Sequence, residues 1–280
     1  MKFEHNNISP LDNRYSNKIS EHREAFSEKS LIKTRFIIEI NWLLFLCKKY
    51  PNYFNKISKS SESKIIKFRN NFDDKSVLKI KQIEKKTNHD VKAVEYFISD
   101  FFKKDKTLSK YINLIHFGLT SEDVNSLSYA ILIKDGINIH SKKINTINKY
   151  IKSLSKKWIN IALLSRTHGQ AASPSTIGKE LKVFTYRIDR ELIKLKQVKP
   201  LAKFSGAVGN YHAFNIANNK INWPLFTKQF INTFGIMQNP ITTQIEPHDW
   251  IAEALQTISR INNIYTDLSQ DMWILSLIHI

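Results

Sequence analysis

Apolar and polar positions alternate along this chain with the period of an α-helix. Between residues 25 and 50 the apolar positions recur at spacings of three and four: Leu31, Ile32, Phe36, Ile37, Ile40, Leu43 and Leu44. This spacing places the apolar side chains on one face of a helix. Pro51 follows, and proline cannot continue a helix because it lacks the backbone N–H. We therefore predict a helix over residues 25–50.

The same period predicts that most of the remaining chain is helical. The stretch from Thr120 to about residue 158 contains no proline, and a helix of roughly 38 residues would be about 57 Å long at 1.5 Å per residue. A short extended piece is expected over 161–165. Further helices are expected over 74–86, 91–104, 174–198 and 224–234, and from 247 onward. The pattern predicts an all-α fold, with an N-terminal helical domain over 1–110 and a central long-helix bundle over 111–280.

Composition supports long helices and a buried core. The 280 residues include 7 glycines and 7 prolines, which is too few for the many turns of an all-β fold. The hydrophobic share of 42% is enough for a core. Residues 272–280 are apolar and carry no helix-ending glycine or charged turn. We therefore expect the bundle to be incomplete, with the chain cut inside its last helix.

The formal net charge of +18 raises the question of a nucleic-acid partner. The lysines are spread along the chain, and no compact basic stripe is interleaved with aromatic residues as a nucleic-acid surface would require. We favour a compositional bias and expect no nucleic-acid partner. A basic protein would still attract a small polyanionic substrate.

Cysteine usage and the N-terminus argue against a metal site and against secretion. The single cysteine, Cys47, lies in an apolar helical stretch, and no Cys/His cluster has zinc spacing. The first 16 residues contain no apolar segment of signal-peptide type, and no apolar run is long enough to span a membrane. We expect a cytoplasmic protein with no membrane partner and no bound metal.

Polar clusters stand at three expected junctions between a loop and a helix, residues 87–90, 120–123 and 167–170. Free N–H groups at a helix start favour anions. Asp90 is expected to cap the helix over 91–104, and Thr120 with Asp123 resembles a capping box. A fourth cluster, 242–244, precedes Pro247, which we expect at the first position of the last helix. Each cluster can also be interpreted as a capping motif, and for residues 120–123 capping alone would suffice. The cluster around His168 has more polar groups than one cap requires, namely Arg166, Thr167, His168 and Gln170.

Two of the nine histidines, His89 and His168, have dense polar neighbours. Histidine titrates near neutral pH, which suits proton transfer. His116 lies between apolar residues and is expected to be structural, and His248 is ambiguous. The others are interpreted as surface or packing residues: His5, His22, His140, His212 and His279.

Five segments resemble elements of adenylosuccinate lyases, in the same order. The match is most specific around THGQ at residues 167–170, because other branches of the fumarase/aspartase superfamily usually carry THLQ at that element. Residues 244–249 resemble the long bacterial type. The segments are SPLDNRY at 9–15, NHD at 88–90, TSED at 120–123, RTHGQAASP at 166–174 and QIEPHD at 244–249.

The resemblance implies an enzyme of de novo purine biosynthesis. Such an enzyme would eliminate fumarate from adenylosuccinate, giving AMP, and from the succinylated aminoimidazole carboxamide ribonucleotide, giving AICAR. It would act as a homotetramer and without a cofactor. His168 would be the general acid or acid–base residue, and His89 would orient the substrate and share proton transfer. The implied substrate-binding residues are Arg14, Tyr15, Asn88, His89, Asp90, Thr120, Ser121 and Gln244, with Lys179 a weaker candidate for anion contact.

One element of the resemblance is missing. The family's catalytic base is a serine on a loop resembling SSxMPxKxNP, whereas none of the three methionines here precedes a proline. We therefore expect a C-terminal truncation and little or no lyase activity from this chain alone. Alternatives are an inactive helical remnant that binds nucleotide or a partner subunit, another lyase of the superfamily such as argininosuccinate lyase, and, with least support, a nucleic-acid-binding protein.

Overall fold

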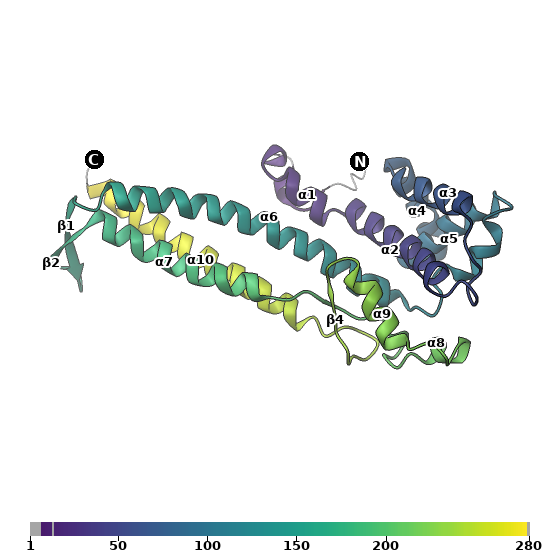
Figure 1. Ribbon diagram of the computed structural model, residues 1–280. Helices are drawn as coiled ribbons and strands as arrows, with labels where there is room; N and C mark the ends of the chain where they lie inside the picture. Colours follow the sequence, from purple (N-terminus) through teal and green to yellow (C-terminus); the bar gives the residue numbers. More distant parts are fainter. Residues whose placement is uncertain (1–6, 13, 279–280) are drawn as a thin grey trace. The chain divides into compact units, whose positions relative to one another are not determined.

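The computed structural model describes residues 7–12 and 14–278, and within them the chain is mainly helical (Figure 1). This confirms the all-α prediction. Short 3-10 helices are η1 (Pro10–Asp12), η2 (Ser16–Lys18) and η3 (Ser109–Leu114). The α-helices are α1 (Ser20–Phe26), α2 (Glu28–Lys49), α3 (Lys59–Asn70), α4 (Asp74–Thr87), α5 (Asp90–Lys103), α6 (Ser121–Lys157), α7 (Ile177–Gln197), α8 (His212–Ala217), α9 (Trp223–Asn232) and α10 (Asp249–Ile278).

The chain divides into two compact units. The first unit comprises Met1–Gly136 and Pro200–His248, and the second comprises Ile137–Lys199 and Asp249–Ile280. Helix α6 therefore contributes its first half to one unit and its second half to the other. The expected domain boundary near residue 110 lies inside the first unit and stays a prediction.

The helix predicted over residues 25–50 is two helices, α1 and α2. Ser27 separates them, because its backbone is extended (φ −70°, ψ 154°) and its side chain accepts the N–H of Ser30 at 3.3 Å. A serine in this position satisfies one of the free N–H groups at a helix start. The apolar pattern was read correctly over α2, but the cap that interrupts the pattern was missed.

Trp42 of α2 is the centre of an aromatic core in the first unit. Its side chain is fully buried, and its indole N–H donates to the carbonyl of Phe117 at 3.0 Å. Aromatic rings packed at an angle stabilise a core beyond the area they bury. Four rings lie with centroids 5.0–6.0 Å from Trp42: Phe204, Phe214, Phe226 and Phe230. This core joins α2 to the segment over residues 200–235.

A second set of aromatic contacts in the first unit joins α2 to α3 and α5. Phe36 of α2 is fully buried, with ring centroids of Phe68, Phe72 and Phe97 at 5.1, 4.9 and 5.9 Å. Helix α4 packs against α5. The helix α5, whose first residues belong to one candidate cluster, is therefore packed against α2, α3 and α4.

The second unit contains the second half of α6 together with α7 and α10, which pack side by side (Figure 1). Asn148 and Lys152 of α6 both donate to Asp189 of α7, at 2.8 and 2.7 Å. The hydroxyl of Tyr265 on α10 donates to the carbonyl of Ile144 at 3.3 Å. The long helices predicted from the sequence thus form a bundle.

A β-hairpin joins α6 to α7 and corrects one predicted helix start. Strand β1 (Ala162–Thr167) pairs antiparallel with β2 (Gln170–Thr176). Pro174 and Ser175 were expected to open a helix, but they pair with β1, and α7 starts at Ile177. The cap is Thr176, whose hydroxyl accepts the N–H of Lys179 at 3.2 Å.

Two further details complete the secondary structure. Strands β3 (Leu201–Ala202) and β4 (Met237–Gln238) form a short parallel pair in the first unit. Pro247 does not occupy the first position of α10 as predicted, because α10 starts at Asp249. Such terminal shifts of one or two residues leave the element itself as predicted.

Candidate active site

Three candidate residues lie at the junction between α4 and α5. Asn88 ends α4 in the left-handed conformation (φ +54°). His89, and not Asp90 as predicted, is the N-cap of α5, because its Nδ1 accepts the N–H of Lys92 at 3.3 Å. Asp90 is the first helical residue, and its side chain and that of His89 are about half exposed.

A buried arginine connects this junction to the start of α6. The Nη2 of Arg35, on α2, pairs with Oδ2 of Asp90 at 2.8 Å. The Nε of Arg35 donates to the side-chain oxygen of Asn125 at 2.8 Å. The guanidinium of Arg35 thus connects the first turn of α5 to the start of α6.

The N-terminus of α6 carries Thr120 and Ser121, both of which are half-buried. Of the predicted capping box only one half forms, because Oδ2 of Asp123 accepts the N–H of Thr120 at 2.8 Å. Asp123 is fully buried and also accepts the N–H of Ser205 at 2.9 Å and that of Gly206 at 3.1 Å. Asp123 therefore does more than cap a helix, since it anchors a loop from a distant part of the chain.

Asp123 also forms a fully buried ion pair. The Nζ of Lys203 lies 2.9 Å from its Oδ1, and both side chains are 0% exposed. The same Nζ donates to the carbonyl of Gly206 at 2.7 Å. A charge buried this deeply is tolerated only when it is paired and hydrogen-bonded.

The segment that carries Gln244 lies against the loop held by Asp123. The hydroxyls of Ser205 and Thr242 are 3.5 Å apart. Gly209 (φ +82°) approaches so closely that a Cβ there would overlap the carbonyl oxygen of Thr242. Gln244 itself is exposed. The first unit therefore brings the segment of Gln244 toward the start of α6.

His248, which the sequence left ambiguous, forms polar contacts with two glutamates. Its Nδ1 lies 3.0 Å from Oε2 of Glu246, and its Nε2 lies 3.5 Å from Oε1 of Glu122. Burial raises the pKa of Glu122 above its ordinary value, although the charge of His248 opposes this. These contacts give a third connection between the first turn of α6 and a neighbouring segment.

His116, which the sequence analysis expects to be structural, contacts Glu39 of α2. Its Nδ1 lies 2.6 Å from Oε1 of Glu39, and its backbone N–H donates to Oε2 of the same carboxylate at 3.0 Å. Burial works to lower the pKa of His116, but the charge and hydrogen bond of Glu39 outweigh it, so that the pKa is raised. Its backbone is left-handed (φ +57°).

Arg14 and Tyr15 are exposed near the start of the chain. The guanidinium of Arg14 lies over the Tyr15 ring, 5.4 Å from its centroid. Asp12 shapes the turn before them, since it accepts two backbone N–H groups and pairs with Arg23 at 2.6 Å. A backbone hydrogen bond from Ser9 is the main cause of the lowered pKa of Asp12. Asn13 of the same motif lies outside the described residues.

His168 belongs to the second unit, at the tip of the β1–β2 hairpin. His168 and Gly169 form the two-residue turn, with φ of +51° and +75° between the paired residues Thr167 and Gln170. Positive φ at both positions is the geometry of a type I′ turn. All four residues are exposed, and in the described part of the chain no hydrogen bond engages the His168 ring.

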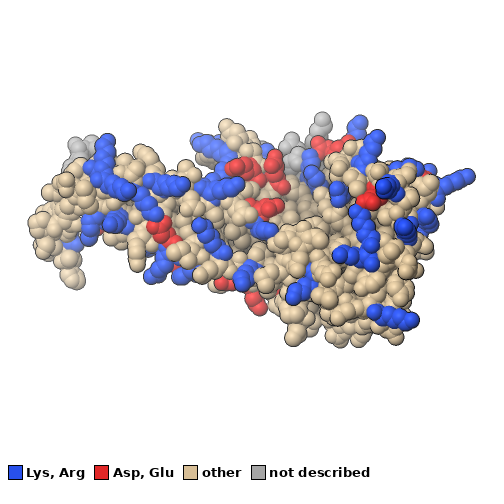
Figure 2. Space-filling model, viewed as in Figure 1, with Lys and Arg blue, Asp and Glu red and all other residues tan. Residues whose placement is uncertain are grey.

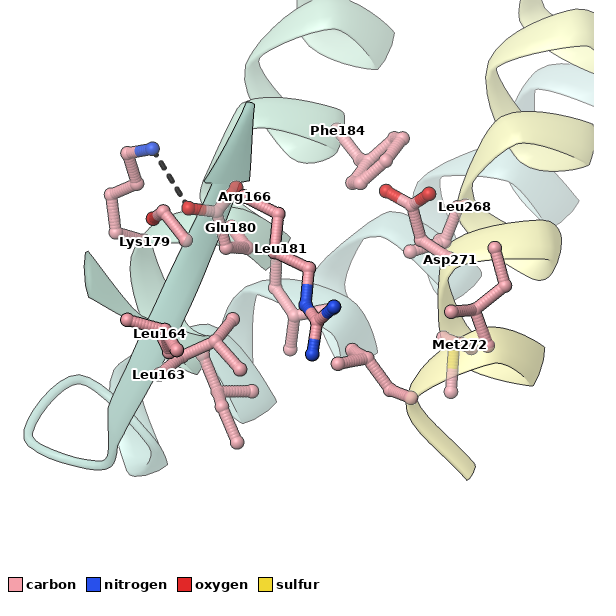
Figure 3. Close-up of a pocket in the computed structure, with 14 residues that line it drawn as sticks. Leu163, Leu164, Arg166, Lys179, Glu180, Leu181, Phe184, Leu268, Asp271 and Met272 are labelled. Atoms are coloured by element: carbon pink, nitrogen blue, oxygen red, sulfur yellow. Dashed lines mark hydrogen bonds and ion pairs between the residues drawn. The ribbon is translucent and has the colours of Figure 1, made fainter. Parts of the chain in front are cut away.

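A cavity of about 420 Å³ lies beside this hairpin, between β1, α7 and α10 (Figure 3). Its lining is mostly apolar and includes Leu163, Leu181 and Leu268, with Arg166 as the cationic group labelled on β1. Lys179, the weaker anion candidate, pairs with Glu180 at 2.8 Å. The cavity contains none of the histidines proposed for proton transfer.

The distribution of charged and metal-ligating side chains bears on what the chain could bind. Lysine and arginine are scattered over the face shown in Figure 2 and do not gather into one patch. Among the described residues, no three His, Cys, Asp or Glu side chains are placed to hold a metal ion. No helix in residues 7–12 and 14–278 combines the length and apolar character needed to cross a membrane.

Comparison with known proteins identifies the family. A family model described as "Lyase" matches residues 13–277. The chain belongs to this lyase family. Its curated relatives include adenylosuccinate lyases of Buchnera aphidicola subsp. Schizaphis graminum (43% identical over 276 residues, 95% of this chain) and Escherichia coli K12 (40% over 278 residues, 95% of this chain). The chain spans about 59% of the length of each of these two relatives.

Two solved structures share the fold of this chain. The fumarate lyase of Mesorhizobium sp. BNC1 superposes with a TM-score of 0.75 at 19% identity, covering 92% of this chain and 57% of that protein. The β-carboxy-cis,cis-muconate cycloisomerase of Acinetobacter calcoaceticus sp. ADP1 gives a TM-score of 0.71 at 17% identity, covering 91% and 57%. These similarities support the helical architecture of the lyase family.

Sequence reasoning missed two buried cations that organise the site of this lyase-family chain. Arg35 interrupts the apolar face of α2, and Lys203 stands between the buried residues Ala202 and Phe204. A charged residue at a position where the pattern requires an apolar one could have indicated a buried ion pair. Their partners, Asp90 and Asp123, lie far away in the sequence, so the pairing itself was not visible.

Proposed function

We propose that this chain acts in a cytoplasmic homotetramer that eliminates fumarate from adenylosuccinate, giving AMP, and from the succinylated aminoimidazole carboxamide ribonucleotide, giving AICAR. The observation that carries the proposal is the first turn of α6. Glu122, Asp123 and Asn125 connect it to the segment of Gln244, to the 203–206 loop and, through Arg35, to Asp90. The names of the curated relatives support the substrate class.

The start of α6 suits the carboxylate on which charge develops during the elimination. Removing a proton next to a succinyl carboxylate places negative charge on its oxygens. The first N–H groups of a helix have no partner inside the helix and attract anions. Asp123 occupies the N–H of Thr120, and the hydroxyls of Thr120 and Ser121 are proposed as donors to that carboxylate. A donor aimed at developing charge contributes about 3–4 kcal/mol to catalysis in known enzymes.

His168 is proposed as the acid that protonates the leaving nitrogen. The turn presents an exposed imidazole at the end of a short hairpin. His89 is proposed to orient the substrate near the leaving group, with Asn88 and Asp90 beside it. Proton transfer by a positioned imidazole is typically worth 10²–10⁴ in rate.

Arg14 and Tyr15 are proposed to bind the nucleotide phosphate. In the described part of the chain, no carboxylate pairs with Arg14, so its guanidinium is available. A guanidinium binds phosphate oxygens through two parallel hydrogen bonds. Gln244 is exposed and is proposed to hydrogen-bond the substrate.

The homotetramer is proposed from the apolar surface of the second unit. On α7, Tyr186 is 72% exposed and Ile193 is 59% exposed, and on α10 Leu255 is 58% exposed. Apolar side chains gathered on a helical bundle indicate a surface that is covered by another chain or segment.

The test follows fumarate release from adenylosuccinate, together with binding of adenylosuccinate by calorimetry. The proposal predicts binding that is weakened at least tenfold by Arg14→Ala and left unchanged by Arg69→Ala, an arginine on α3 outside the candidate site. Any release is expected to be lost in His168→Ala and kept in His212→Ala, an exposed histidine outside the motifs.

The outcomes separate the proposal from its alternative. Binding without release fits the alternative, an inactive helical remnant that binds nucleotide. If the chain neither binds adenylosuccinate nor releases fumarate, both the proposal and its alternative are contradicted.

A further inference from the structure

The permanently charged side chain of Arg35 is buried on the apolar face of α2. Its side chain is 6% exposed, and neighbouring residues on the same helix include the fully buried Phe36 and Ile38. Burying a guanidinium is unfavourable unless good partners compensate its desolvation. Its partners are Asp90 at the start of α5 and Asn125 near the start of α6, each at 2.8 Å.

The capping bond of α5 determines where the His89 ring carries its proton. The Nδ1 of His89 accepts the N–H of Lys92 at 3.3 Å. A neutral imidazole has one nitrogen that accepts and one that donates. For a neutral ring this contact places the proton on Nε2, where the half-exposed ring can offer the N–H to a ligand.

The carboxylate of Asp90 favours the other tautomer of His89, with the proton on Nδ1. Its Oδ1 lies 3.6 Å from Nδ1 of His89, and a carboxylate next to an imidazole nitrogen favours a proton on that nitrogen. Two groups draw the carboxylate away, since Oδ1 accepts the N–H of Val91 at 2.8 Å and Oδ2 pairs with Arg35 at 2.8 Å. Of these two groups, only Arg35 carries a charge.

We propose that Arg35 is a positioning residue: by holding Asp90, it keeps His89 in the Nε2–H form, so that His89 meets the substrate as a hydrogen-bond donor. The identity of the acceptor, an atom of the succinylated nucleotide, rests on the proposed function. The tautomer and its control by Arg35 rest on the contacts within the first unit alone.

The experiment records long-range ¹H–¹⁵N spectra of the imidazole rings of the ¹⁵N-histidine-labelled chain at pH 8. The signals of His89 are assigned from a His89→Gln sample. The wild-type chain is expected to show Nδ1 unprotonated and Nε2 protonated. In Arg35→Gln this pattern is expected to be lost, with the proton moving to Nδ1. Arg69→Gln, which removes an arginine of α3 that bonds Asn41 at 2.7 Å, is the matched control and should leave His89 unchanged.

A second substitution separates control of the tautomer from a packing role. In the double variant with Arg35→Gln and Asp90→Asn no carboxylate competes for the proton, so the Nε2–H pattern is expected to return. A packing role for Arg35 predicts no such rescue. The proposal is overturned if wild-type His89 carries its proton on Nδ1, if Arg35→Gln folds with an unchanged His89 spectrum, or if the double variant stays in the Nδ1–H form.

Arg35→Lys replaces Arg35→Gln if circular dichroism shows that the glutamine variant does not fold. A lysine keeps a buried cation but does not offer the planar fork that reaches two partners. A partial shift of the proton to Nδ1 is expected, and an unchanged spectrum counts against the proposal.

Addition of AMP tests the donor role separately from the proposed function. A shift of the His89 Nε2 signal with AMP supports a donated hydrogen bond. Binding of AMP with no change at His89 overturns the donor role. Failure to bind AMP counts against the proposed function, while the spectra without ligand still decide the role of Arg35.

Discussion

Replacing Lys203 with methionine removes the only charged partner of Asp123 among the described residues and keeps a side chain of similar length. In the wild type both side chains are fully buried, 2.9 Å apart. Asp123 would keep its three backbone donors, from Thr120, Ser205 and Gly206. Its carboxylate would be left as a buried charge without a counter-charge.

The expected loss of stability follows from this geometry. Breaking a buried ion pair by removing one partner costs about 3–5 kcal/mol. The three remaining N–H donors still stabilise the carboxylate, so we expect the lower end, about 3 kcal/mol. At roughly 2–4 °C per kcal/mol for a chain of this size, the melting temperature should fall by about 6–12 °C.

Thermal unfolding followed by far-UV circular dichroism measures this loss. Lys179→Met is the matched control, because Lys179 is 61% exposed and pairs with Glu180 on the surface, where an ion pair contributes about 0–1 kcal/mol. A Lys203→Met variant that melts within about 2 °C of the wild type would refute the reasoning. The Asp123–Lys203 pair would then not hold the 203–206 loop to the start of α6.

Three further outcomes follow from the structure. The pKa of His116 is raised in the folded state above its ordinary value of 6.5. Its pairing with Glu39 therefore stabilises the folded chain below pH 6.5, and this stabilisation is lost as pH rises through the raised folded value. His116→Gln should flatten the fall in melting temperature between pH 6 and pH 9, and an unaltered pH profile would contradict this. Gly178→Ala should destabilise the chain by about 1–3 kcal/mol in urea unfolding, because its Cβ would overlap the carbonyl oxygen of Ser155; a neutral effect would show that this helix contact is loose. Thr176→Ala should cost about 1 kcal/mol through loss of the α7 cap, and Thr176→Ser should restore most of it, whereas equal stability of all three proteins would exclude a capping role.

The helices were the part of the fold that the sequence predicted best. Apolar spacing located α2, α6 and α10 because each buries one face against neighbours, and this repeats every three or four residues. Helix ends were less predictable. Ser27 and Thr176 each supply a capping oxygen where the apolar pattern gives no sign of a break, so the starts of α2 and α7 were misplaced.

The β1–β2 hairpin escaped prediction for a related reason. Its turn is formed by His168 and Gly169, and a histidine is an uncommon residue at positive φ. Pro174, which the sequence analysis assigned to a helix start, instead pairs with Leu164 in the strand. Only the first strand was anticipated, as an extended piece over 161–165.

The individual residues of the candidate site could be predicted from the sequence, but the contacts that bring them together could not. Capping chemistry and resemblance pointed to His89, Thr120 and His168. The buried charges that connect the site segments, Arg35 and Lys203, pair with residues remote in sequence. Such contacts depend on how α2, α5, α6 and the segment over residues 200–206 pack together, which no local sequence pattern encodes.

The most direct test of the proposed elimination joins this chain to the part of the Escherichia coli adenylosuccinate lyase that its alignment leaves uncovered. Fumarate release from adenylosuccinate is then followed by absorbance, with His168→Ala and His212→Ala chimeras measured in parallel. We expect the chimera to release fumarate, the His168→Ala form to lose at least a hundredfold in rate, and the His212→Ala form to match the parent. A folded chimera that binds adenylosuccinate and releases no fumarate, or one whose rate survives His168→Ala, would contradict the account.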